Sequence, residues 1–269
     1  FAAVAAVLLN TLVLRTMWHN RGQLKPIEGL IALLACNDIF MVAGGFPLQV
    51  HSSFAHTWKY GETGCSIYAF LVFLGGIANI YILMTLSVLR FIKICCSQKY
   101  GRRISGRVVA ILAVLVYLLA LVLSLCPLFG WGEYGPSEHG SLCTLKWRRH
   151  RDYLATIFIV VFFVPLGSMA ISYSRICCTL HRLNRTISSV RREVQIVRMS
   201  GFMCVGFLLA WSPYAIISMI YAFGNPDIAI PPWISATMSL FAKSSTCYNP
   251  CIYFIMNRKF RKLIEKEFR

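Results

Sequence analysis

Seven long apolar stretches limit the folds open to this chain. Hydrophobic residues make up 57% of its 269 residues and charged residues only 14%, whereas about a quarter of a soluble domain is charged. A helix needs about 20 apolar residues to cross a bilayer. The candidate stretches are 1–14, 27–50, 65–92, 107–128, 152–178, 194–223 and 230–256. We therefore predict an all-α membrane protein, a bundle of seven transmembrane helices over residues 1–256, with the first helix cut short at its start.

The charge distribution supports this reading and orients the chain. The net charge is +17, and 21 of the 27 Lys and Arg residues lie on segments that would face the cytoplasm if the tail after the seventh helix is inside. This asymmetry follows the positive-inside rule and suits the anionic lipid of the inner leaflet. We predict a multi-pass plasma-membrane protein with its N-terminus outside, with lipid and not nucleic acid as a partner. The six histidines show no helical i, i+4 pair, so we predict no metal site.

Lys243 lies inside the last apolar stretch, about midway between Pro231 and Arg258. A charged ammonium near the centre of a bilayer costs about 2.5–3.5 kcal/mol. One interpretation is a side chain that snorkels to the membrane surface, which works only near helix ends. The other is a chemical use, because desolvation favours the neutral and nucleophilic amine. We therefore predict that Lys243 forms a Schiff base with an aldehyde ligand.

Lys243, followed by Asn249-Pro250-x-x-Tyr253, resembles the seventh helix of animal opsins, the retinal-binding branch of the rhodopsin-like G-protein-coupled receptors. The resemblance extends along the whole chain. It implies a light-sensing receptor rather than an enzyme, with retinal (11-cis or all-trans) bound to Lys243. It further implies that photoisomerisation moves the sixth helix outward and activates a heterotrimeric G protein. Arrestin and a receptor kinase are expected as further partners.

The resemblance also assigns a chromophore pocket of four residues: Tyr68, Gly76, Trp211 and Tyr214. Tyr68 occupies the position of the glutamate that balances a protonated Schiff base in vertebrate visual opsins, so the chain is more similar to non-visual types such as neuropsin and encephalopsin. Gly76 is expected to leave room for a flat ligand. Trp211 is expected beneath the ligand, in a helix bent by Pro213. Plain aromatic packing is the alternative role for Trp211 and Tyr214.

Two contacts are expected to fix the second outside loop as a lid. The resemblance implies a disulfide between Cys65 and Cys143, on the side of the membrane that is oxidising. Opsins often have a basic residue at the position of Glu133 and an aspartate at that of Lys146. Because both signs are reversed here, we expect the same salt bridge with exchanged partners. An exposed pair of this kind contributes about 0–1 kcal/mol.

The sequence does not determine which residue is the counterion of the Schiff base. Glu138 is the candidate, next to Ser137, which occupies the family's alternative counterion position. Adjacent side chains on an extended strand point to opposite faces, so Glu138 is expected to point away from the ligand unless it turns inward or acts through water. In one alternative the Schiff base is protonated and absorbs visible light. In the other, which we favour, no anion is near and the pigment absorbs in the ultraviolet.

The resemblance implies a set of residues for activation and G-protein coupling: Arg90, Glu193, Tyr173, Asn249, Pro250, Tyr253, Asp38 and Asn10. Asn10, Asp38 and Asn249 are expected to form a polar cluster that binds water or sodium and relays activation, with a merely structural network as the alternative. A buried carboxylate of this kind faces the bundle interior.

The segment Leu89-Arg90-Phe91 departs from the family pattern Asp/Glu-Arg-Tyr. Arg90 is still expected to pair with Glu193, but it lacks the neighbouring carboxylate, which predicts activity without light or altered coupling. The departure also motivates an alternative function, a retinal photoisomerase of opsin fold with weak signalling. A second alternative is a receptor for a diffusible ligand that merely retains Lys243. Finally, residues 257–269 are typical of an amphipathic helix along the inner interface.

Overall fold

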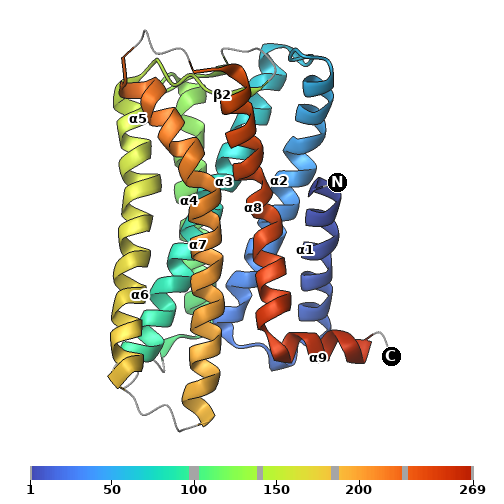
Figure 1. The fold of residues 1–269 in the computed structure, drawn as a ribbon, viewed down its shortest axis with the longest axis vertical. Helices are drawn as coiled ribbons and strands as arrows, with labels where there is room; N and C mark the ends of the chain where they lie inside the picture. Colours follow the sequence, from blue (N-terminus) through green and yellow to red (C-terminus); the bar gives the residue numbers. More distant parts are fainter. Residues whose placement is uncertain (1, 97–102, 138–141, 183–187, 226–229, 268–269) are drawn as a thin grey trace.

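The computed structural model describes residues 2–96, 103–137, 142–182, 188–225 and 230–267. Long helices run side by side along the vertical axis of Figure 1, and a short helix crosses their lower end. Six of the transmembrane helices are single elements: α1 (Ala2–His19), α2 (Gly29–Phe54), α3 (Gly61–Cys95), α4 (Gly106–Leu125), α7 (Ser188–Phe223) and α8 (Pro232–Met256). The fifth helix along the chain is continuous through three elements: α5 (Arg151–Ile157), the π-helix η5 (Phe158–Phe163) and α6 (Val164–Arg182). The crossing helix is α9 (Arg258–Glu267). The predicted seven-helix bundle is confirmed.

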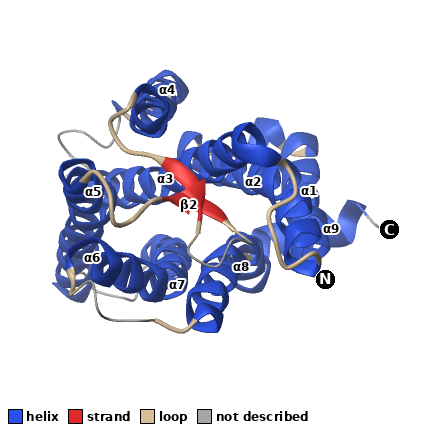
Figure 2. Cartoon of the chain, turned by 90° about the horizontal axis from the view of Figure 1, so that it is seen from above, coloured by secondary structure: helices blue, strands red, loops and turns tan. Residues whose placement is uncertain are grey.

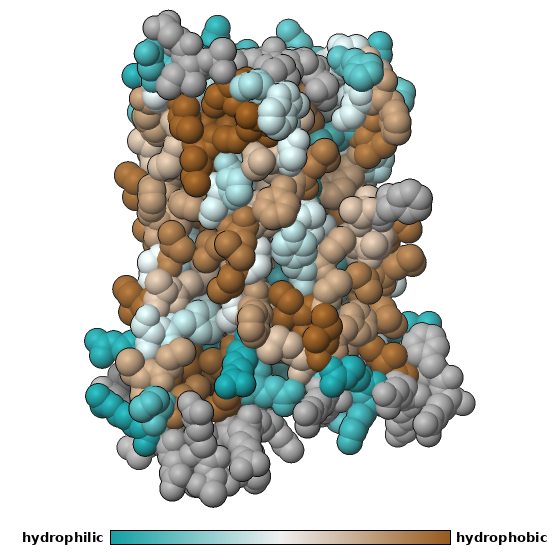
Figure 3. All heavy atoms as spheres, in the orientation of Figure 1, coloured by the Kyte–Doolittle hydropathy of each residue, from teal (hydrophilic) through white to brown (hydrophobic). Residues whose placement is uncertain are grey.

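The face of the bundle shown in Figure 3 is apolar over most of its height, and hydrophilic residues gather at its two ends. Large apolar side chains such as Leu115 and Ile171 are exposed on it, as suits a surface that faces lipid. Six helices in the described part of the chain are long and apolar enough to cross a membrane. The remaining one, α8, is more polar because it carries Lys243 and Asn249 among other polar residues.

The helix α3 passes through the middle of the bundle, where it contacts α2, α4, α6 and α7. It has the longest run of buried residues, and its two central glycines include Gly75, where a Cβ atom would overlap the side chain of Met41 of α2. Because backbone polar groups in lipid must be satisfied within the protein, helices at this depth can be interrupted only where a neighbour supplies a partner. Two such places occur in the described helices.

The first interruption is at Pro250, which lies inside α8, and the helix continues through it to Met256. Proline has no N–H, so it leaves the carbonyl four residues earlier, that of Thr246, without its helical donor. The side chain of Asn10 on α1 donates to that carbonyl at 3.0 Å. A neighbouring helix thus satisfies the freed group and keeps α8 intact.

The second interruption is the π-helix η5. Here Val164 N–H donates to the carbonyl of Ile159, so the next donor in register would be residue 165, which is proline. The carbonyl of Val160 therefore lacks a backbone donor, and the hydroxyl of Tyr81 on α3 donates to it at 2.7 Å. This contact ties the centre of α3 to the wide turn of the fifth helix.

A two-stranded antiparallel hairpin, β1 (Tyr134–Pro136) and β2 (Cys143–Leu145), covers one end of the bundle. We call this the outer end and the opposite one the inner end, after the predicted orientation. Figure 2 looks down on this end and shows the hairpin across the space that the helices surround. The predicted disulfide is confirmed: Cys65 of α3 is bonded to Cys143, with their Cα atoms 5.3 Å apart. The hairpin is therefore anchored to α3 and forms a lid.

At the inner end α9 runs across the bundle (Figure 1) and contacts α1 and α8. The ring of Phe260 packs against Tyr253, with ring centroids 4.6 Å apart, and against Phe254. An arginine of the same helix, Arg261, donates to the carbonyl of Phe254 at 3.1 Å. The predicted helix is thus present and is attached to the end of α8 through one buried aromatic residue.

Removing the lid disulfide is expected to destabilise the fold. Replacing Cys143 by alanine should lower the free energy of unfolding by about 2–4 kcal/mol, because the unfolded chain is no longer cross-linked and has a higher conformational entropy. Thermal unfolding in detergent measures the change. Cys177→Ala, at an exposed free thiol, is the matched control and should leave the transition unchanged. Equal transitions for the two variants would contradict the anchoring role of the disulfide.

Candidate functional site

A cavity of 380 Å³ lies inside the bundle beneath the lid. It is lined mainly by apolar and aromatic side chains from α3, the fifth helix and α7, among them Phe73, Phe162 and Phe207, while the hairpin closes it from outside. This volume is in the range of pockets that bury small organic ligands. A ligand that fills it must be mostly apolar.

Lys243 lines this cavity from α8 and is only 9% exposed. Its Nζ donates to the Oε1 atom of Gln49, to the hydroxyl of Tyr68 at 3.1 Å and to the hydroxyl of Ser239 at 3.2 Å. Within the described part of the chain, these hydrogen-bond partners of the amine are all neutral. Among the residues that the structure describes, the site therefore presents a primary amine to an apolar cavity with no carboxylate bonded to it.

The partners of Lys243 are themselves held in place. Tyr68 is buried and donates to Gln49 Oε1 at 2.7 Å, and its ring packs against Trp58 at 5.2 Å between centroids. The indole of Trp58 in turn donates to the carbonyl of Gly61 at 2.9 Å. Tyr68 therefore lies in the predicted pocket, whereas Gln49 was not predicted. Gln49 could have been singled out from the sequence, because it is an amide side chain inside the apolar stretch 27–50.

Trp211 forms the inner wall of the cavity. Its indole N–H donates to Ser245 of α8 at 3.0 Å, and its ring stacks on Phe207. A Cβ atom built on Gly76 would lie 3.3 Å from the Trp211 ring. The sequence predicted that Gly76 leaves room for a ligand. It lines the cavity, but part of its space is taken by this tryptophan, so the glycine also permits close packing of α3 and α7.

Tyr214, one turn further along α7, connects the cavity to the lid. Its hydroxyl and that of Thr144 in β2 lie 2.9 Å apart and share a hydrogen bond. Its ring also packs edge-on against Trp147 and Trp211, with centroids 6.1 and 6.2 Å away. A movement of α7 near Tyr214 would therefore change its contacts with Thr144 and Trp147 of the lid.

Deeper in the bundle, Asp38 of α2 is completely buried. It accepts a hydrogen bond from Asn79 of α3 at 2.7 Å and one from Asn249 of α8 at 3.4 Å. Asn79 also accepts from Asn37 at 2.9 Å. The predicted cluster thus contains Asp38 and Asn249 but is centred on Asn79, which the sequence did not single out. The hydrogen bonds of Asn10 run instead to carbonyls of α1 and α8.

At the inner end of α3, Arg90 is 1% exposed. The hydroxyl of Tyr173 on α6 lies 3.7 Å from the thiol of Cys204 on α7, which is 3.3 Å from the hydroxyl of Ser87. Three helices meet at this buried thiol. The predicted partner of Arg90, Glu193, belongs to α7, but its side chain lies outside the described residues. The predicted counterion Glu138 lies outside them as well.

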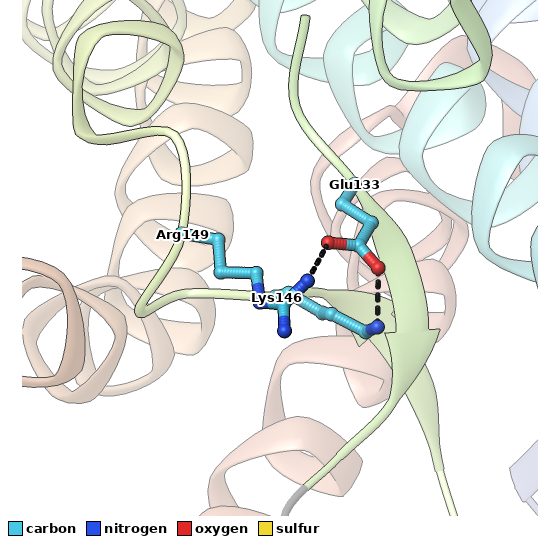
Figure 4. A network of polar contacts seen from close by, with 3 residues as sticks. All are labelled: Glu133, Lys146 and Arg149. Atoms are coloured by element: carbon cyan, nitrogen blue, oxygen red, sulfur yellow. Dashed lines mark hydrogen bonds and ion pairs between the residues drawn. The ribbon is translucent and has the colours of Figure 1, made fainter. Parts of the chain in front are cut away.

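The expected lid salt bridge is present (Figure 4). Lys146 Nζ contacts Glu133 Oε1, and Arg149 contacts the other carboxylate oxygen at 3.0 Å. The hydrogen bond from Lys146, with that from Arg149 adding to it, lowers the pKa of Glu133 below its ordinary value. The second cation was not predicted. Both lysine and glutamate are about one third exposed, so the bridge sets lid geometry more than stability.

Comparison with known proteins gives consistent matches over the full length. Residues 9–253 match the 7 transmembrane receptor (rhodopsin family). The visual pigment-like receptor peropsin of Homo sapiens is 33% identical over 278 residues, covering 100% of this chain and 82% of that protein. Opsin-5 of Mus musculus is 30% identical, covering 93% and 70%. The crystal structure of squid rhodopsin superposes with a TM-score of 0.88 at 25% identity, covering 99% of this chain and 82% of that one.

The lid salt bridge is expected to depend on the signs of its partners and on pH. A double-mutant cycle of Glu133→Gln and Lys146→Gln should give a coupling of about 0.2–1 kcal/mol at neutral pH. Because the pKa of Glu133 is lowered in the folded protein, this stabilisation is complete above the ordinary glutamate pKa of about 4.3 and is lost as pH falls through the lowered value.

Thermal unfolding of the four proteins at neutral and acidic pH measures both effects. The exchanged pair, Glu133→Lys with Lys146→Glu, should regain part of the coupling, although Arg149 then faces a lysine. A coupling that is unchanged in strong acid would contradict the assigned role of Glu133.

Proposed function

The chain belongs to the opsins, within the rhodopsin family of seven-transmembrane receptors, and on this premise we propose that it senses light through retinal attached to Lys243. The observation that carries the proposal is the position of this amine. It is buried, faces a cavity of 380 Å³ with aromatic walls, and has only neutral hydrogen-bond partners among the described residues. Such surroundings suit a long apolar aldehyde and favour the nucleophilic form of the amine.

When bound, retinal supplies the absorption of light and the change of shape that follows isomerisation. The residues of the chain bind the ligand and respond to its change of shape. Ser239 and Tyr68 orient the nitrogen of Lys243. The lid, anchored by Cys143, restricts access of water from outside. Trp211 closes the inner end, where a change in ligand shape meets the junction of α3, α7 and α8.

Movement of α7 is the proposed output. Trp211 lies two residues before Pro213, and α7 continues through this proline without the hydrogen bond that its missing N–H would make. A push on Trp211 would therefore act beside a locally weakened turn. A ligand shifts a conformational equilibrium only through contacts that differ between the two states. The contacts available are the hydrogen bond to Ser245, the stack on Phe207 and the close approach to Gly76.

The inner end is the proposed docking site for a heterotrimeric G protein. Outward movement of α7 would open a space beside Arg90, which is buried in the described structure. Tyr173, Tyr253 and Pro250 are proposed to rearrange with it, and Asp38 and Asn249 to link this end to the pocket. We place the receptor in the plasma membrane with its N-terminus outside. Arrestin and a receptor kinase are proposed as further partners of the same face.

Covalent attachment of retinal should require Lys243. We expect Lys243→Ala protein, mixed with 11-cis-retinal in the dark and treated with borohydride, to yield no retinyl adduct, because no other buried amine lines the cavity in the described part of the chain. Mass spectrometry of the digested protein measures the adduct. The matched control is Lys146→Ala, which removes a lysine from the lid and should retain the adduct on Lys243. Undiminished attachment in Lys243→Ala would overturn the proposal.

Light should stimulate nucleotide exchange on a G protein through Arg90. With the wild-type pigment in membranes, illumination is expected to increase exchange several-fold over the dark rate. Arg90→Ala should abolish this increase while leaving the absorption spectrum unchanged, because Arg90 lies at the inner end, away from the cavity. Isomerisation of retinal without any exchange on a panel of G proteins would favour the photoisomerase alternative instead.

A further inference from the structure

We propose that Gln49 takes the position of a counterion in this pigment: an uncharged amide lies where a carboxylate would balance a positive charge on the nitrogen of Lys243, so the linked chromophore is neutral and ultraviolet-absorbing in the dark. The inference rests on the proposed attachment to Lys243 and adds to it a residue that sets the charge state. Gln49 belongs to α2, and neither the polar cluster around Asp38 nor the lid salt bridge involves it.

The side-chain oxygen of Gln49 is positioned as a hydrogen-bond acceptor for Lys243 and Tyr68. The side chain is 4% exposed, and its Oε1 atom accepts from Lys243 Nζ and, at 2.7 Å, from the hydroxyl of Tyr68. An amide oxygen has two lone pairs, so these two donors fill its capacity. Leaving such a buried oxygen without donors would be costly. Gln49 therefore fixes the direction in which the nitrogen of Lys243 points.

Tyr68 allows the same site to serve a nitrogen without a proton. Its hydroxyl lies 2.7 Å from Gln49 Oε1 and 3.1 Å from Lys243 Nζ. A hydroxyl has one proton to donate, so it can turn from the amide oxygen to a nitrogen that has become an acceptor. The amide of Gln49 can then rotate so that its N–H group donates to the hydroxyl oxygen of Tyr68. The pair of Gln49 and Tyr68 thus satisfies a neutral nitrogen by side-chain rotation alone.

No described carboxylate takes over the role of an anion at this position. Asp38 accepts from Asn79 and Asn249 deeper in the bundle, and Glu133 is engaged by Lys146 and Arg149 on the lid. Asp152 accepts from the indole of Trp131 at 2.6 Å. An opposite charge within about 4–6 Å is what favours a charged nitrogen, and an amide provides only a dipole. The residue at position 49 is therefore the point where a single substitution can supply that charge.

The decisive experiment replaces this amide by its charged isostere. Wild-type and Gln49→Glu proteins are reconstituted with 11-cis-retinal and their spectra recorded in the dark at neutral pH. We expect a main band in the ultraviolet for wild type and a shift of that band into the visible for Gln49→Glu. Gln195→Glu is the matched control: the same change at a side chain that donates to Met256 at the inner end should leave the band in the ultraviolet.

Two spectral results would overturn the inference. One is a Gln49→Glu band that stays in the ultraviolet in a protein that folds and binds retinal. The other is a visible main band in wild type, since the nitrogen would then be charged; persistence of that band in Gln49→Leu would show that the charge is balanced elsewhere, with Glu138 the first candidate. Failure of the proposed function itself is distinguishable, because wild-type protein would then give no adduct on Lys243 after borohydride treatment, whatever its spectrum.

A second measurement tests the positioning role even if Gln49→Glu fails to fold. Gln49→Leu removes the acceptor and replaces it with an apolar side chain of similar size. The rate at which 11-cis-retinal forms a trapped adduct with Lys243 in the dark should fall about fivefold to tenfold, the effect of losing one hydrogen bond that orients the amine. The control Ser244→Ala changes a neighbour of Lys243 whose hydroxyl instead bonds Phe241 and Tyr248. Equal rates for wild type and Gln49→Leu would overturn the inference.

Discussion

The structure depends on one constraint, that a polar group within a bilayer must find its partner inside the protein. Lys243 finds three neutral oxygens, and Asp38 finds two amides. The same constraint acts on the backbone. Carbonyls freed by Pro250 and Pro165 are satisfied by Asn10 and Tyr81. The side chains that carry function and those that merely allow a proline in a helix are therefore parts of one system of contacts.

The helix α8 collects most of these contacts. Lys243 reaches α2 and α3, Ser245 accepts from Trp211 of α7, the carbonyl of Thr246 accepts from α1, and Asn249 donates to α2. These are the residues that make α8 less apolar than its neighbours. Together these contacts join α8 to α1, α2, α3 and α7, so a change at Lys243 acts on a helix that is bonded to four others. This gives a physical reason for a ligand on α8 to affect the position of α7.

Sequence reasoning predicted the seven-helix bundle, the disulfide between Cys65 and Cys143 and the contact of Glu133 with Lys146. These follow from apolar length, from motif resemblance and from paired charges, which are all properties of the chain itself. It did not predict Gln49 or Asn79, although both are polar residues within apolar stretches. Their roles depend on how each helix is rotated about its axis, and α2 and α3 are apolar on nearly all sides. The sequence pattern thus leaves their inward faces undefined.

The described hydrogen-bond partners of Lys243 are all neutral, and this connects the chemistry of the site to its stability. A carboxylate next to the lysine would favour its charged form, and removing one partner from such a buried pair leaves an uncompensated charge that costs several kcal/mol. An amide acceptor avoids both consequences. It satisfies the amine by a hydrogen bond, and desolvation then favours the neutral form, which is the form that attacks an aldehyde. In the proposed function, the same surroundings that make Lys243 tolerable in the bundle without ligand would therefore make it reactive. Tyr68, within reach of both Gln49 and the nitrogen, would then donate to that nitrogen after the amine has reacted.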